Sequence, residues 1–591
     1  MKSELEQLLK IMKEKEIAAY LITSSDFHNS EYIGDYFKTR EFISGFTGSA
    51  GTLVVMENAT GLWTDGRYFI QAKQELLNSG IELYEMGQSN VPTIIDFLND
   101  KLSFNQKLGF DGRQIAALEG QMYQQSLRNK NIQLSYEEDL VAQIWHDRPN
   151  LATNPAFLLS EEYTGESIFS KLKRLRKVMI NNKTDAHLIT TLDEIAWLFN
   201  MRGNDISFSP LVLAYAYLTL DEVHLFLDAS KLNEELKQEL LKVKTQLHDY
   251  QEITEFIKNI KVYQGIMVDK TRVNYLLYQS LPQDIQIVDK QNPCVMFKCV
   301  KNELELANIR QAQIKDSIVF TKFMYWLKTS VNQEKITEQS ALNKLEQLRQ
   351  QFTNYLSPAF ATISAYKEHA AIMHYSVSAK SDYEIKNEGL YLCDSGAHFL
   401  EGTTDITRTF VLGQISEKQR SHFTAVVQGM LRLSNTKFLA GTRGFNLDAI
   451  ARAPIWQLNL DYLSGTGHGI GYLTNVHEAP IGIRQQINDL TKLSAGMLLS
   501  NEPGIYIEGS HGIRIENDLI INNGIHNEQG QFLEFETVTL VPIDLDGIEL
   551  EALSDQDKQY LNDYHQRVYQ TIATYLNDEE KIWLKKYTRT V

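Results

Sequence analysis

The sequence predicts a multidomain chain of mixed α/β and α+β class, with two α/β units followed by one larger α+β unit. The chain has 591 residues, which is too long for a single hydrophobic core. A helix-then-strand pattern at the N-terminus recurs weakly later in the chain, and the C-terminal half alternates long helices with strands of alternating polarity. We expect the three units to cover residues 1–150, 151–300 and 301–591.

The first unit begins with a predicted helix and a predicted buried strand. Leu5, Leu8, Leu9 and Met12 recur at helical spacing, and the apolar run AAYLIT follows them. The stretch WHDRPNLATNP, which contains Pro149, interrupts both periodicities. It is therefore the first expected linker.

The second unit resembles the first in two short stretches. LITTLDEIAWLF, from Leu188, echoes LITSSD, from Leu21, and LFLD, from Leu225, echoes LWTD, from Leu62, at a similar offset. Weak self-similarity over this length is typical of a duplicated module. We therefore expect two α/β modules of the same design.

The third unit begins near Cys299 and is predicted to contain two long helices. Their apolar positions follow helical spacing: Leu306, Ile309, Ala312, Val319, Phe323 and Trp326 in one, and Phe423, Val427, Met430, Ser434 and Phe438 in the other. After Pro542 a charge-rich tail is predicted to be helical, with Trp583 and Leu584 docking it.

Composition argues against several classes of partner. The formal net charge is −17 and the pI about 5.4, whereas a nucleic-acid or anionic-membrane partner would require a basic face. Three cysteines, Cys294, Cys299 and Cys393, provide neither a disulfide framework nor a zinc site. The N-terminus lacks an apolar signal core, and the apolar run 211–220 is shorter than the ~20 residues of a membrane span. We expect a soluble cytoplasmic protein.

Five residues with metal-ligand chemistry fall within roughly a fifth of the chain. Each lies in a short motif that contains or adjoins glycine: LCDSGAHF, GTTDITRTF, GTGHGIG, SNEPGIYI and GIRIEND, which hold Asp394, Asp405, His468, Glu502 and Glu516. Four carboxylates and one imidazole form a hard, oxygen-rich set. Such a set suits Mn²⁺, Fe²⁺ or Co²⁺ better than structural zinc, which favours thiolates and imidazoles.

The local patterns predict that these residues share one site. Residues 405–410 and 514–519 alternate polar and apolar side chains as strands do. Asp394 ends another short strand, and a glycine-containing linker to Asp405 fits a hairpin. Carboxylates brought together in this way repel one another unless cations lie between them. Two metal ions bridged by two of the carboxylates satisfy that requirement.

In this order, the five motifs resemble those of the pita-bread metallopeptidases, which include methionine aminopeptidase, prolidase and aminopeptidase P. AAIMHY, with His374, and TNVHEAP, with His477, resemble the additional histidine motifs of the proline-directed members. Residues 41–69 and 192–203 are similar to the long three-domain cytosolic type. The resemblance covers nearly the whole chain. One departure is Ala479, where the VHEGP pattern has glycine, and it leaves the ligands untouched.

The resemblance implies two creatinase-like N-terminal domains and a C-terminal pita-bread catalytic domain. It also implies two divalent metal ions, with Mn²⁺ the first choice and Co²⁺, Fe²⁺ or Zn²⁺ as alternatives. Asp394 would hold one ion, His468 and Glu502 mainly the other, and Asp405 and Glu516 would bridge them. Members of the family are commonly dimers or higher oligomers, and a homodimer is the expected form.

A hydroxide that bridges the two metals is the expected nucleophile, and Glu502 is expected to pass its proton to the leaving nitrogen. His374 and His477 are expected near the substrate, where one donates a hydrogen bond to the developing oxyanion. Which histidine does so stays open at this point, because His477 is equally suited to hold the substrate carbonyl. Arg514, two residues before Glu516, is expected to orient a ligand carboxylate from behind.

The expected activity is that of an Xaa-Pro aminopeptidase acting on short peptides with proline in the second position, with no nucleic-acid or membrane partner. One alternative is a prolidase, which cleaves the dipeptide Xaa-Pro and reads its free carboxylate. The other is a pita-bread module that binds peptides without catalysis. Such modules have substituted metal positions, whereas all five are intact here.

Overall fold

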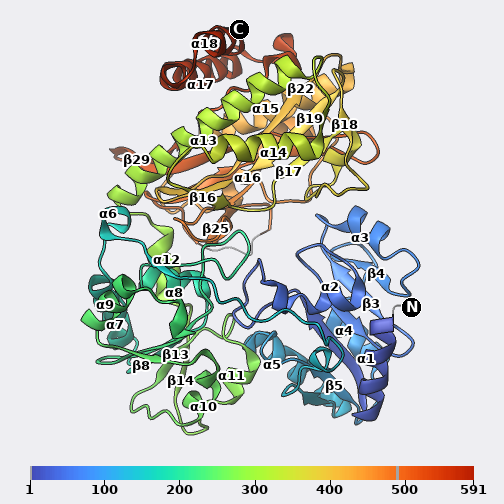
Figure 1. Cartoon of the computed structure of the whole chain (residues 1–591), viewed down its shortest axis with the longest axis vertical. Coiled ribbons are helices and arrows are strands. Elements are labelled where there is room, and N and C mark those ends of the chain that lie inside the picture. The colour runs from blue at the N-terminus through green and yellow to red at the C-terminus, as the bar shows by residue number, and fades with distance from the viewer. Residues whose placement is uncertain (1–2, 487–490) are drawn as a thin grey trace. The chain divides into compact units, whose positions relative to one another are not determined.

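The computed structural model describes residues 3–486 and 491–591 (Figure 1). The chain forms two compact units. The N-terminal unit consists of Met1–Glu161 with Glu166–Val295, and the C-terminal unit of Glu162–Gly165 with Met296–Val591. None of the helices in the described ranges combines the length and apolar character needed to cross a bilayer.

Two six-stranded sheets of the same design form the framework of the N-terminal unit. Their strand orders are β4-β3-β2-β1-β5-β6 and β12-β11-β10-β8-β13-β14. In each sheet the first pairing is parallel, the next two are antiparallel and lead to the strand β1 or β8, and the two pairings after that strand are parallel. The strands are β1 (Ile17–Thr23), β2 (Thr52–Val55), β3 (Gly61–Thr64), β4 (Glu82–Glu85), β5 (Lys107–Phe110) and β6 (Gln133–Ser135), then β8 (Ala186–Ile189), β10 (Tyr215–Thr219), β11 (Val223–Phe226), β12 (Thr245–His248), β13 (Ile266–Val268) and β14 (Ile287–Asp289).

The repeat predicted from the sequence is confirmed by these pairings. LITSSD and LITTLDE supply the central strands β1 and β8, while LWTD and LFLD supply β3 and β11, which occupy the same position in their sheets. A small third sheet pairs β7 (Phe157–Leu158) with β9 (Met201–Arg202). The polypeptide therefore builds one α/β design twice.

Helices pack on these sheets through apolar stripes. The predicted first helix is α1 (Ser3–Glu14), which buries Leu5, Leu8 and Met12 in the same core as β1. The other helices of the unit are α2 (Thr39–Ser44), α3 (Phe69–Glu75), α4 (Ile94–Lys101), α5 (Ala117–Ser126), α7 (Ile168–Asn181), α8 (Leu192–Leu198), α9 (Glu234–Lys242), α10 (Ile253–Lys258) and α11 (Tyr275–Gln279). The chain passes between the two units within α6 (Glu161–Thr164) and α12 (Pro293–Cys299).

The C-terminal unit is an α+β domain whose sheets carry the predicted ligands. Its largest sheet has the order β23-β30-β29-β26-β24-β25, and a second sheet has the order β17-β19-β22. Smaller sheets are β16-β20-β21, β15-β18 and β27-β28. The strands are β15 (Ile336–Thr337), β16 (Tyr355–Pro358), β17 (Ile363–Tyr366), β18 (Glu384–Ile385), β19 (Leu390–Ser395), β20 (Ala397–Phe399), β21 (Gly402–Thr403), β22 (Ile406–Val411), β23 (Lys437–Leu439), β24 (Gly467–Gly469), β25 (Glu478–Ile483), β26 (Leu498–Asn501), β27 (Gly504–Ile507), β28 (His511–Arg514), β29 (Asn517–Asn527) and β30 (Gly530–Thr537).

The helices of this unit largely follow the predicted spacing. They are α13 (Glu303–Ser330), α14 (Glu338–Arg349), α15 (Glu417–Ser434), α16 (Gly444–Trp456), α17 (Asp555–Ile572) and α18 (Asp578–Tyr587). The predicted second long helix is α15, but it ends at Ser434, so the extension to Phe438 was wrong. Phe438 lies in β23, because this segment pairs with β30 and buries the ring from a strand. The helical tail is confirmed as α17 and α18, with Leu584 buried and Trp583 packed against the core.

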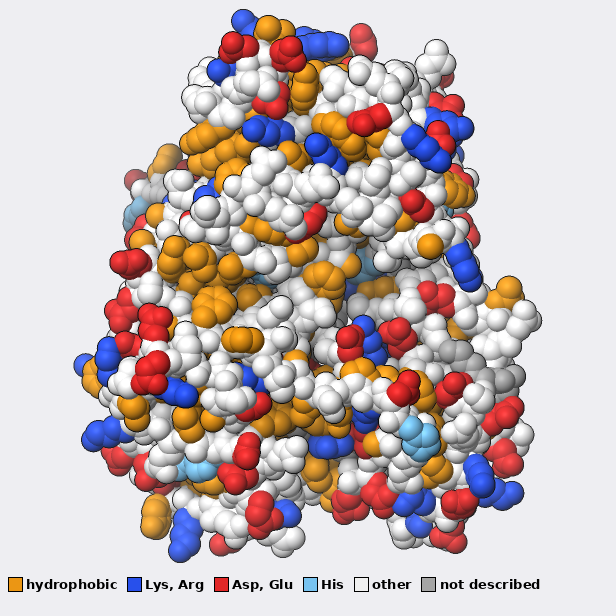
Figure 2. Space-filling view, viewed as in Figure 1, with side chains coloured by type: hydrophobic (Ala, Val, Ile, Leu, Met, Phe, Trp, Pro, Cys, Tyr) orange, Lys and Arg blue, Asp and Glu red, His pale blue; other side chains and the backbone are white. Residues whose placement is uncertain are grey.

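On the face shown in Figure 2, acidic and basic side chains are interspersed and apolar side chains lie between them.

Candidate metal centre

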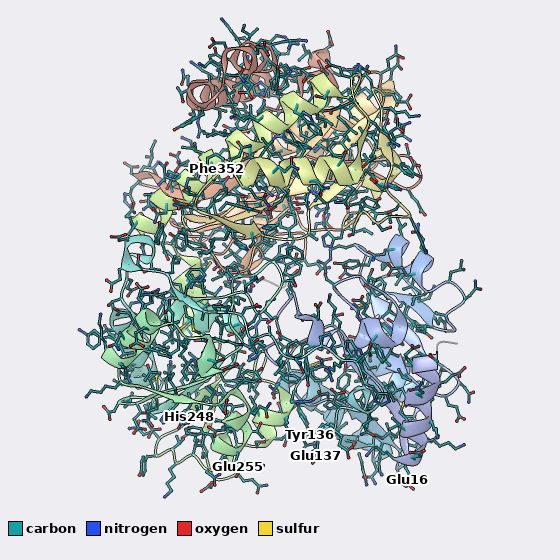
Figure 3. The ribbon with its side chains drawn as sticks, viewed as in Figure 1. Glu16, Tyr136, Glu137, His248, Glu255 and Phe352 are labelled. Atoms are coloured by element: carbon teal, nitrogen blue, oxygen red, sulfur yellow. The ribbon has the colours of Figure 1, made fainter. Side chains whose placement is uncertain are left out.

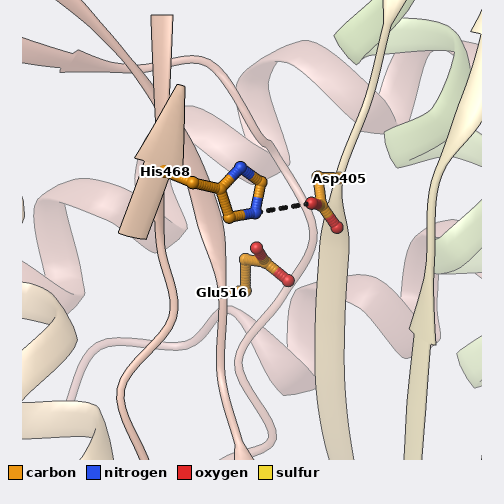
Figure 4. Close-up of side chains that lie close together, drawn as sticks. All are labelled: Asp405, His468 and Glu516. Carbon is orange, nitrogen blue, oxygen red and sulfur yellow. Dashed lines mark ion pairs between the residues drawn. The ribbon is translucent and has the colours of Figure 1, made fainter. Parts of the chain in front are cut away.

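Three of the predicted ligands converge in the C-terminal unit. Asp405, His468 and Glu516 each place one ligand atom within 4.8 Å of the others (Figure 4). Nε2 of His468 lies 3.4 Å from Oδ2 of Asp405 and 3.3 Å from Oε1 of Glu502. The structure thus brings a fourth predicted ligand, Glu502, to the same imidazole. Asp405 and Glu516 are buried, and His468 and Glu502 are half-buried.

Glycines on both sides of His468 let β24 approach its neighbours. A Cβ added to Gly467 would lie 2.0 Å from the carbonyl oxygen of Ser500, and one on Gly469 would lie 2.4 Å from that of Glu478. Only glycine avoids both collisions. Nδ1 of His468 donates to the carbonyl oxygen of Gly469 at 2.9 Å. This hydrogen bond sets the tautomer and directs Nε2 toward the carboxylates.

Asp394 reaches the centre through strand pairing. β19 and β22 run antiparallel with Asp394 opposite Thr407, which brings Asp394 beside the strand that follows Asp405. The linker between the two aspartates was expected to be a simple hairpin turn. It contains β20 and β21, which pair with each other in a different sheet. The antiparallel pairing was therefore predicted correctly, and the linker is more elaborate than predicted.

Glu516 lies at a break between two strands. The alternation over 514–519 predicted one continuous strand, but β28 ends at Arg514 and β29 begins at Asn517. The break arises because β28 pairs with β27, whereas β29 pairs with β26 in the largest sheet. Glu516 lies in the connection between β28 and β29, and hydrogen bonds with Thr407 of β22 fix its position. Its N–H donates to the carbonyl oxygen of Thr407 at 3.1 Å, and the Thr407 hydroxyl donates to Oε2 of Glu516 at 2.6 Å.

Burial and mutual repulsion raise the pKa of several acids in the centre. Burial raises the pKa of Asp394 to about 6, although the Arg514 guanidinium opposes the shift. Burial, together with the negative charge of Asp405, raises the pKa of Glu516 and of Asp518 well above their ordinary values. Such shifts show that the protein alone does not compensate these charges.

The contact between His468 and Glu502 favours the charged form of both groups. Burial disfavours the charged imidazole, but hydrogen bonds to Asp405 and Glu502 outweigh it and raise the pKa of His468 well above its usual value. Burial likewise opposes ionisation of Glu502, yet the hydrogen bond and charge of His468 lower its pKa. The carboxylates thus attract positive charge to the position that Nε2 faces.

Unpaired oxygens indicate what the centre is built to hold. Among the described residues, none donates a hydrogen bond to Oδ1 of Asp394, Oε1 of Glu516 or Oδ1 of Asp518, although all three atoms are buried. Burying an unpaired carboxylate oxygen is costly, so such atoms normally have a partner. Hard oxygen donors with one imidazole are a ligand set for divalent cations. The residues present therefore fit a centre for divalent metal ions.

Arg514 makes the contact expected of a residue that orients a ligand. Its Nη2 contacts Oδ2 of Asp394, its Nη1 donates to the hydroxyl of Tyr506 at 2.6 Å, and its Nε donates to Oγ1 of Thr407 at 3.2 Å. Sequence reasoning did not assign Tyr506 or Thr407. Thr407 lies on the polar face of the predicted strand, which was an available signal, whereas Tyr506 had none. Asp518, at the start of β29, accepts from the N–H of Asp405 at 3.0 Å.

The two additional histidines border this centre. The His477 ring lies 4.3 Å from the His468 ring and is nearly perpendicular to it. His374 follows Met373, whose carbonyl oxygen is 3.5 Å from Nη2 of Arg514. Both imidazoles are half-buried. Their catalytic roles stay predictions.

A buried glutamate that sequence reasoning missed anchors the segment carrying His374. Glu338, 0% exposed, accepts hydrogen bonds from the N–H of Tyr366 at 2.6 Å and of Tyr383 at 3.1 Å. It also accepts from the Tyr375 hydroxyl at 3.0 Å and lies 2.9 Å from Nδ1 of His369. These partners lie on both sides of His374 in the sequence. Glu338 therefore fixes where this segment can lie.

Family models cover nearly the whole chain. Two models described as creatinase/prolidase N-terminal domain match residues 4–141 and 147–305. The model for metallopeptidase family M24 matches residues 307–523, and that for its C-terminal region matches 531–591. The predicted fold class is confirmed, while the unit boundaries at 150 and 300 stay predictions.

Relatives match along their full length. A Laccaria bicolor protein named "Probable Xaa-Pro aminopeptidase P" is 36% identical over 98% of this chain and 92% of its own, and Xaa-Pro aminopeptidase 1 of Dictyostelium discoideum is 36% identical over 98% and 95%. The crystal structure of X-prolyl aminopeptidase from Caenorhabditis elegans, described as a cytosolic enzyme with a di-nuclear active site, is 32% identical. It covers 100% of both chains with a TM-score of 0.95. The predicted family is confirmed: the chain belongs to metallopeptidase family M24, among the Xaa-Pro aminopeptidases that carry two creatinase/prolidase-type N-terminal domains.

Proposed function

We propose that this chain is a metal-dependent aminopeptidase that removes the N-terminal residue from short peptides with proline in the second position. The observation that carries the proposal is the convergence of Asp405, His468 and Glu516, together with the buried unpaired carboxylate oxygens beside them. Full-length similarity to Xaa-Pro aminopeptidases supports the substrate class.

Five side chains would hold two divalent ions in this proposal. Asp394 would hold one ion, His468 and Glu502 mainly the other, and Asp405 and Glu516 would bridge them. The short distances from His468 to Asp405 and to Glu502 support this grouping. When bound, such a pair of ions supplies Lewis acidity that lowers the pKa of water and polarises a carbonyl group. Mn²⁺ is our first choice, with Co²⁺, Fe²⁺ and Zn²⁺ as alternatives, because cellular availability decides among ions that one site can bind.

Glu502 is the proposed proton carrier. Its Oε1 accepts from the Ser500 hydroxyl at 3.1 Å and lies 3.3 Å from Nε2 of His468. Oε2 is the oxygen left to take a proton. Glu502 would hold the metal ions as a carboxylate, and in that ionised form it can accept a proton and then transfer it to the departing proline nitrogen.

His374 and His477 divide the remaining tasks. Stabilising the oxyanion of the tetrahedral intermediate requires a hydrogen-bond donor placed where the negative charge develops. We propose that one of the two imidazoles donates this hydrogen bond and that the other binds the peptide. Arg514 keeps the Asp394 carboxylate in place through its contact with Oδ2.

We further propose that this chain forms a homodimer. We also propose that it works in the cytoplasm, because the C. elegans enzyme is described as cytosolic. Trp456, at the end of α16, is 42% exposed, and Leu463 just after it is 65% exposed. Exposed large apolar side chains of this kind support a protein contact near the end of α16. A Trp456→Glu variant that runs as a monomer in size-exclusion chromatography with light scattering, where the wild type runs as a dimer, would support this assignment.

The substrate class is tested with metal-stripped protein titrated with Mn²⁺. We expect Mn²⁺-dependent release of arginine from Arg-Pro-Pro and little cleavage of Arg-Pro. Cleavage of Arg-Pro alone would identify a prolidase, and no cleavage with any divalent ion would identify a peptide-binding module.

A further inference from the structure

A buried cluster of two lysines and one glutamate lies beside the segment that carries His477. Nζ of Lys298 donates to Oε1 of Glu478 at 3.1 Å, and Nζ of Lys301 contacts Oε2 of the same carboxylate. The three side chains are at most 3% exposed. Side chains fill the space between the helices and sheets of the C-terminal unit in Figure 3, so charged groups buried there need partners within the protein.

Lys301 contacts both ends of the segment that carries His477. β24 and β25 are antiparallel neighbours, and residues 470–477 connect them. Ile470 is the first residue of this segment, and Glu478 follows its last. Besides contacting Glu478, Nζ of Lys301 donates to the carbonyl oxygens of Ile470 at 2.7 Å and of Cys299 at 3.3 Å. Each of the three N–H groups of the ammonium therefore has an acceptor.

The backbone of Lys301 is itself held in place. Its N–H donates to the carbonyl oxygen of Gly496 at 2.9 Å, and the N–H of Gly496 donates to the carbonyl oxygen of Ile521 in β29 at 2.9 Å. The next residue, Asn302, caps the first turn of α13 with its side chain. Lys301 thus links the segment that carries His477 to the largest sheet and to the start of a long helix.

The gain in stability gives little reason to bury charged groups in this way. Replacing a buried ion pair with apolar side chains often leaves stability unchanged or raises it. The cluster instead provides a fixed geometry, because a different lysine binds each oxygen of Glu478. A peptide bond joins Glu478 to His477, whose ring lies 4.3 Å from that of His468. Holding Glu478 therefore restricts where the backbone of His477 can lie.

We propose that Glu478, held by Lys298 and Lys301, is the positioning residue for the His477 imidazole during peptide hydrolysis. This inference rests on the proposed function, because it takes His477 to contact the peptide or the oxyanion. A hydrogen-bond donor stabilises a developing charge best when it is already in place before the reaction begins. The lysines supply that preorganisation from the side of the segment that they contact.

The test is a double-mutant cycle with full-length protein loaded with Mn²⁺. Lys301→Met leaves Lys298 to pair with Glu478, so the carboxylate keeps a positive partner and the fold should survive. Removing a group that orients a functional side chain should lower kcat/KM on Arg-Pro-Pro by about 10–100-fold. In the His477→Gln background the same change should cost less than about twofold, because the residue through which it acts is gone. An equal loss in both backgrounds would overturn the proposal.

Hydrogen–deuterium exchange tests the same contacts without requiring activity. Amides of residues 471–477 should exchange faster in Lys301→Met than in the wild type, while metal content stays at two equivalents. Lys298→Met should show the same pattern, and it replaces Lys301→Met in both measurements if that variant does not fold. Unchanged exchange over this segment would overturn the proposal. An inactive wild type would instead refute the proposed function, and the exchange would still show whether the lysines hold the segment.

Lys328→Met is the matched control. Lys328 is also a buried lysine of the C-terminal unit, with its side chain 7% exposed and its Nζ 2.6 Å from Oδ2 of Asp544. It makes no printed contact with residues 470–478, so its loss should lower Tm but leave kcat/KM and the exchange of 471–477 unchanged. A loss of kcat/KM in this control equal to that in Lys301→Met would mean that any buried lysine has the same effect, which would also overturn the proposal.

Discussion

Two groups of buried acids in the C-terminal unit differ in how completely they are paired. Glu338 is fully buried, and both of its oxygens accept hydrogen bonds from neighbouring groups. Asp316 is also fully buried, and both of its oxygens likewise accept hydrogen bonds. The donors are Arg349 and Thr404. Acids of this kind need nothing from outside the protein.

The acids of the metal centre, in contrast, lack some of the hydrogen-bond donors that would pair their buried oxygens. Asp394, Glu516 and Asp518 each leave one buried oxygen without a donor among the described residues, and burial raises the pKa of all three. The number of hydrogen-bond donors thus distinguishes these three acids from Glu338 and Asp316.

The largest effect is expected for Glu516→Gln. The amide matches the protonated carboxylic acid in shape, so the fold of the metal-free protein should survive. Metal content should fall below two equivalents, and activity should fall by much more than the ~10–100-fold that loss of a supporting residue costs. Metal analysis and kcat/KM on a Xaa-Pro-Xaa tripeptide check this. Near-wild-type turnover with full metal occupancy would rule out the bridging role.

Substitution of the two bordering histidines should separate catalysis from metal binding. His374→Gln and His477→Gln should keep two equivalents of metal, because neither residue is a proposed ligand. The variant that removes the oxyanion donor should lose about 10²–10³-fold in kcat. The variant that removes a peptide contact should mainly raise KM. Loss of metal in either variant would show that the histidine is a ligand after all.

A smaller effect on activity is expected for Glu338→Gln, which disrupts one of the fully hydrogen-bonded acids. One carboxylate oxygen becomes an NH₂ that faces donors, and leaving such groups unpaired costs about 1–3 kcal/mol. Tm should fall, kcat should fall about tenfold because the segment carrying His374 is loosened, and metal content should stay at two equivalents. A drop in Tm with unchanged kcat would mean that Glu338 has no part in positioning His374.

The last prediction concerns the pH dependence of stability in the metal-free protein and not catalytic activity. The pKa of Asp394 is raised to about 6 in the folded state from an ordinary value of 3.8. Between these values the native state binds more protons than the unfolded state, so stability falls as pH rises, by about 3 kcal/mol in all. Tm of metal-free wild type should therefore fall more steeply from pH 4 to 6.5 than Tm of Asp394→Asn. Parallel curves would contradict the assignment of this shift to Asp394.

Sequence patterns within a few residues of a ligand correctly predicted the local backbone around Asp405 and His468. Alternation around Asp405 predicted β22, and the glycines beside His468 predicted close backbone approach, because both signals lie within a few residues of the side chain concerned. The break at Glu516 was missed because it depends on which sheet each flanking strand joins. Glu338 was missed because an acid in the first turn of a helix is usually an exposed partner of the helix dipole. Its burial comes from distant segments that surround it.

The most direct test of the central claim is the activity of metal-stripped protein on Arg-Pro-Pro, followed against equivalents of added Mn²⁺ under tight-binding conditions. If the buried unpaired carboxylates form one dinuclear centre, activity should rise until two equivalents are bound and then stay constant, and Glu516→Gln should show no such rise. Full activity before any metal is added, or with both proteins alike, would contradict the account.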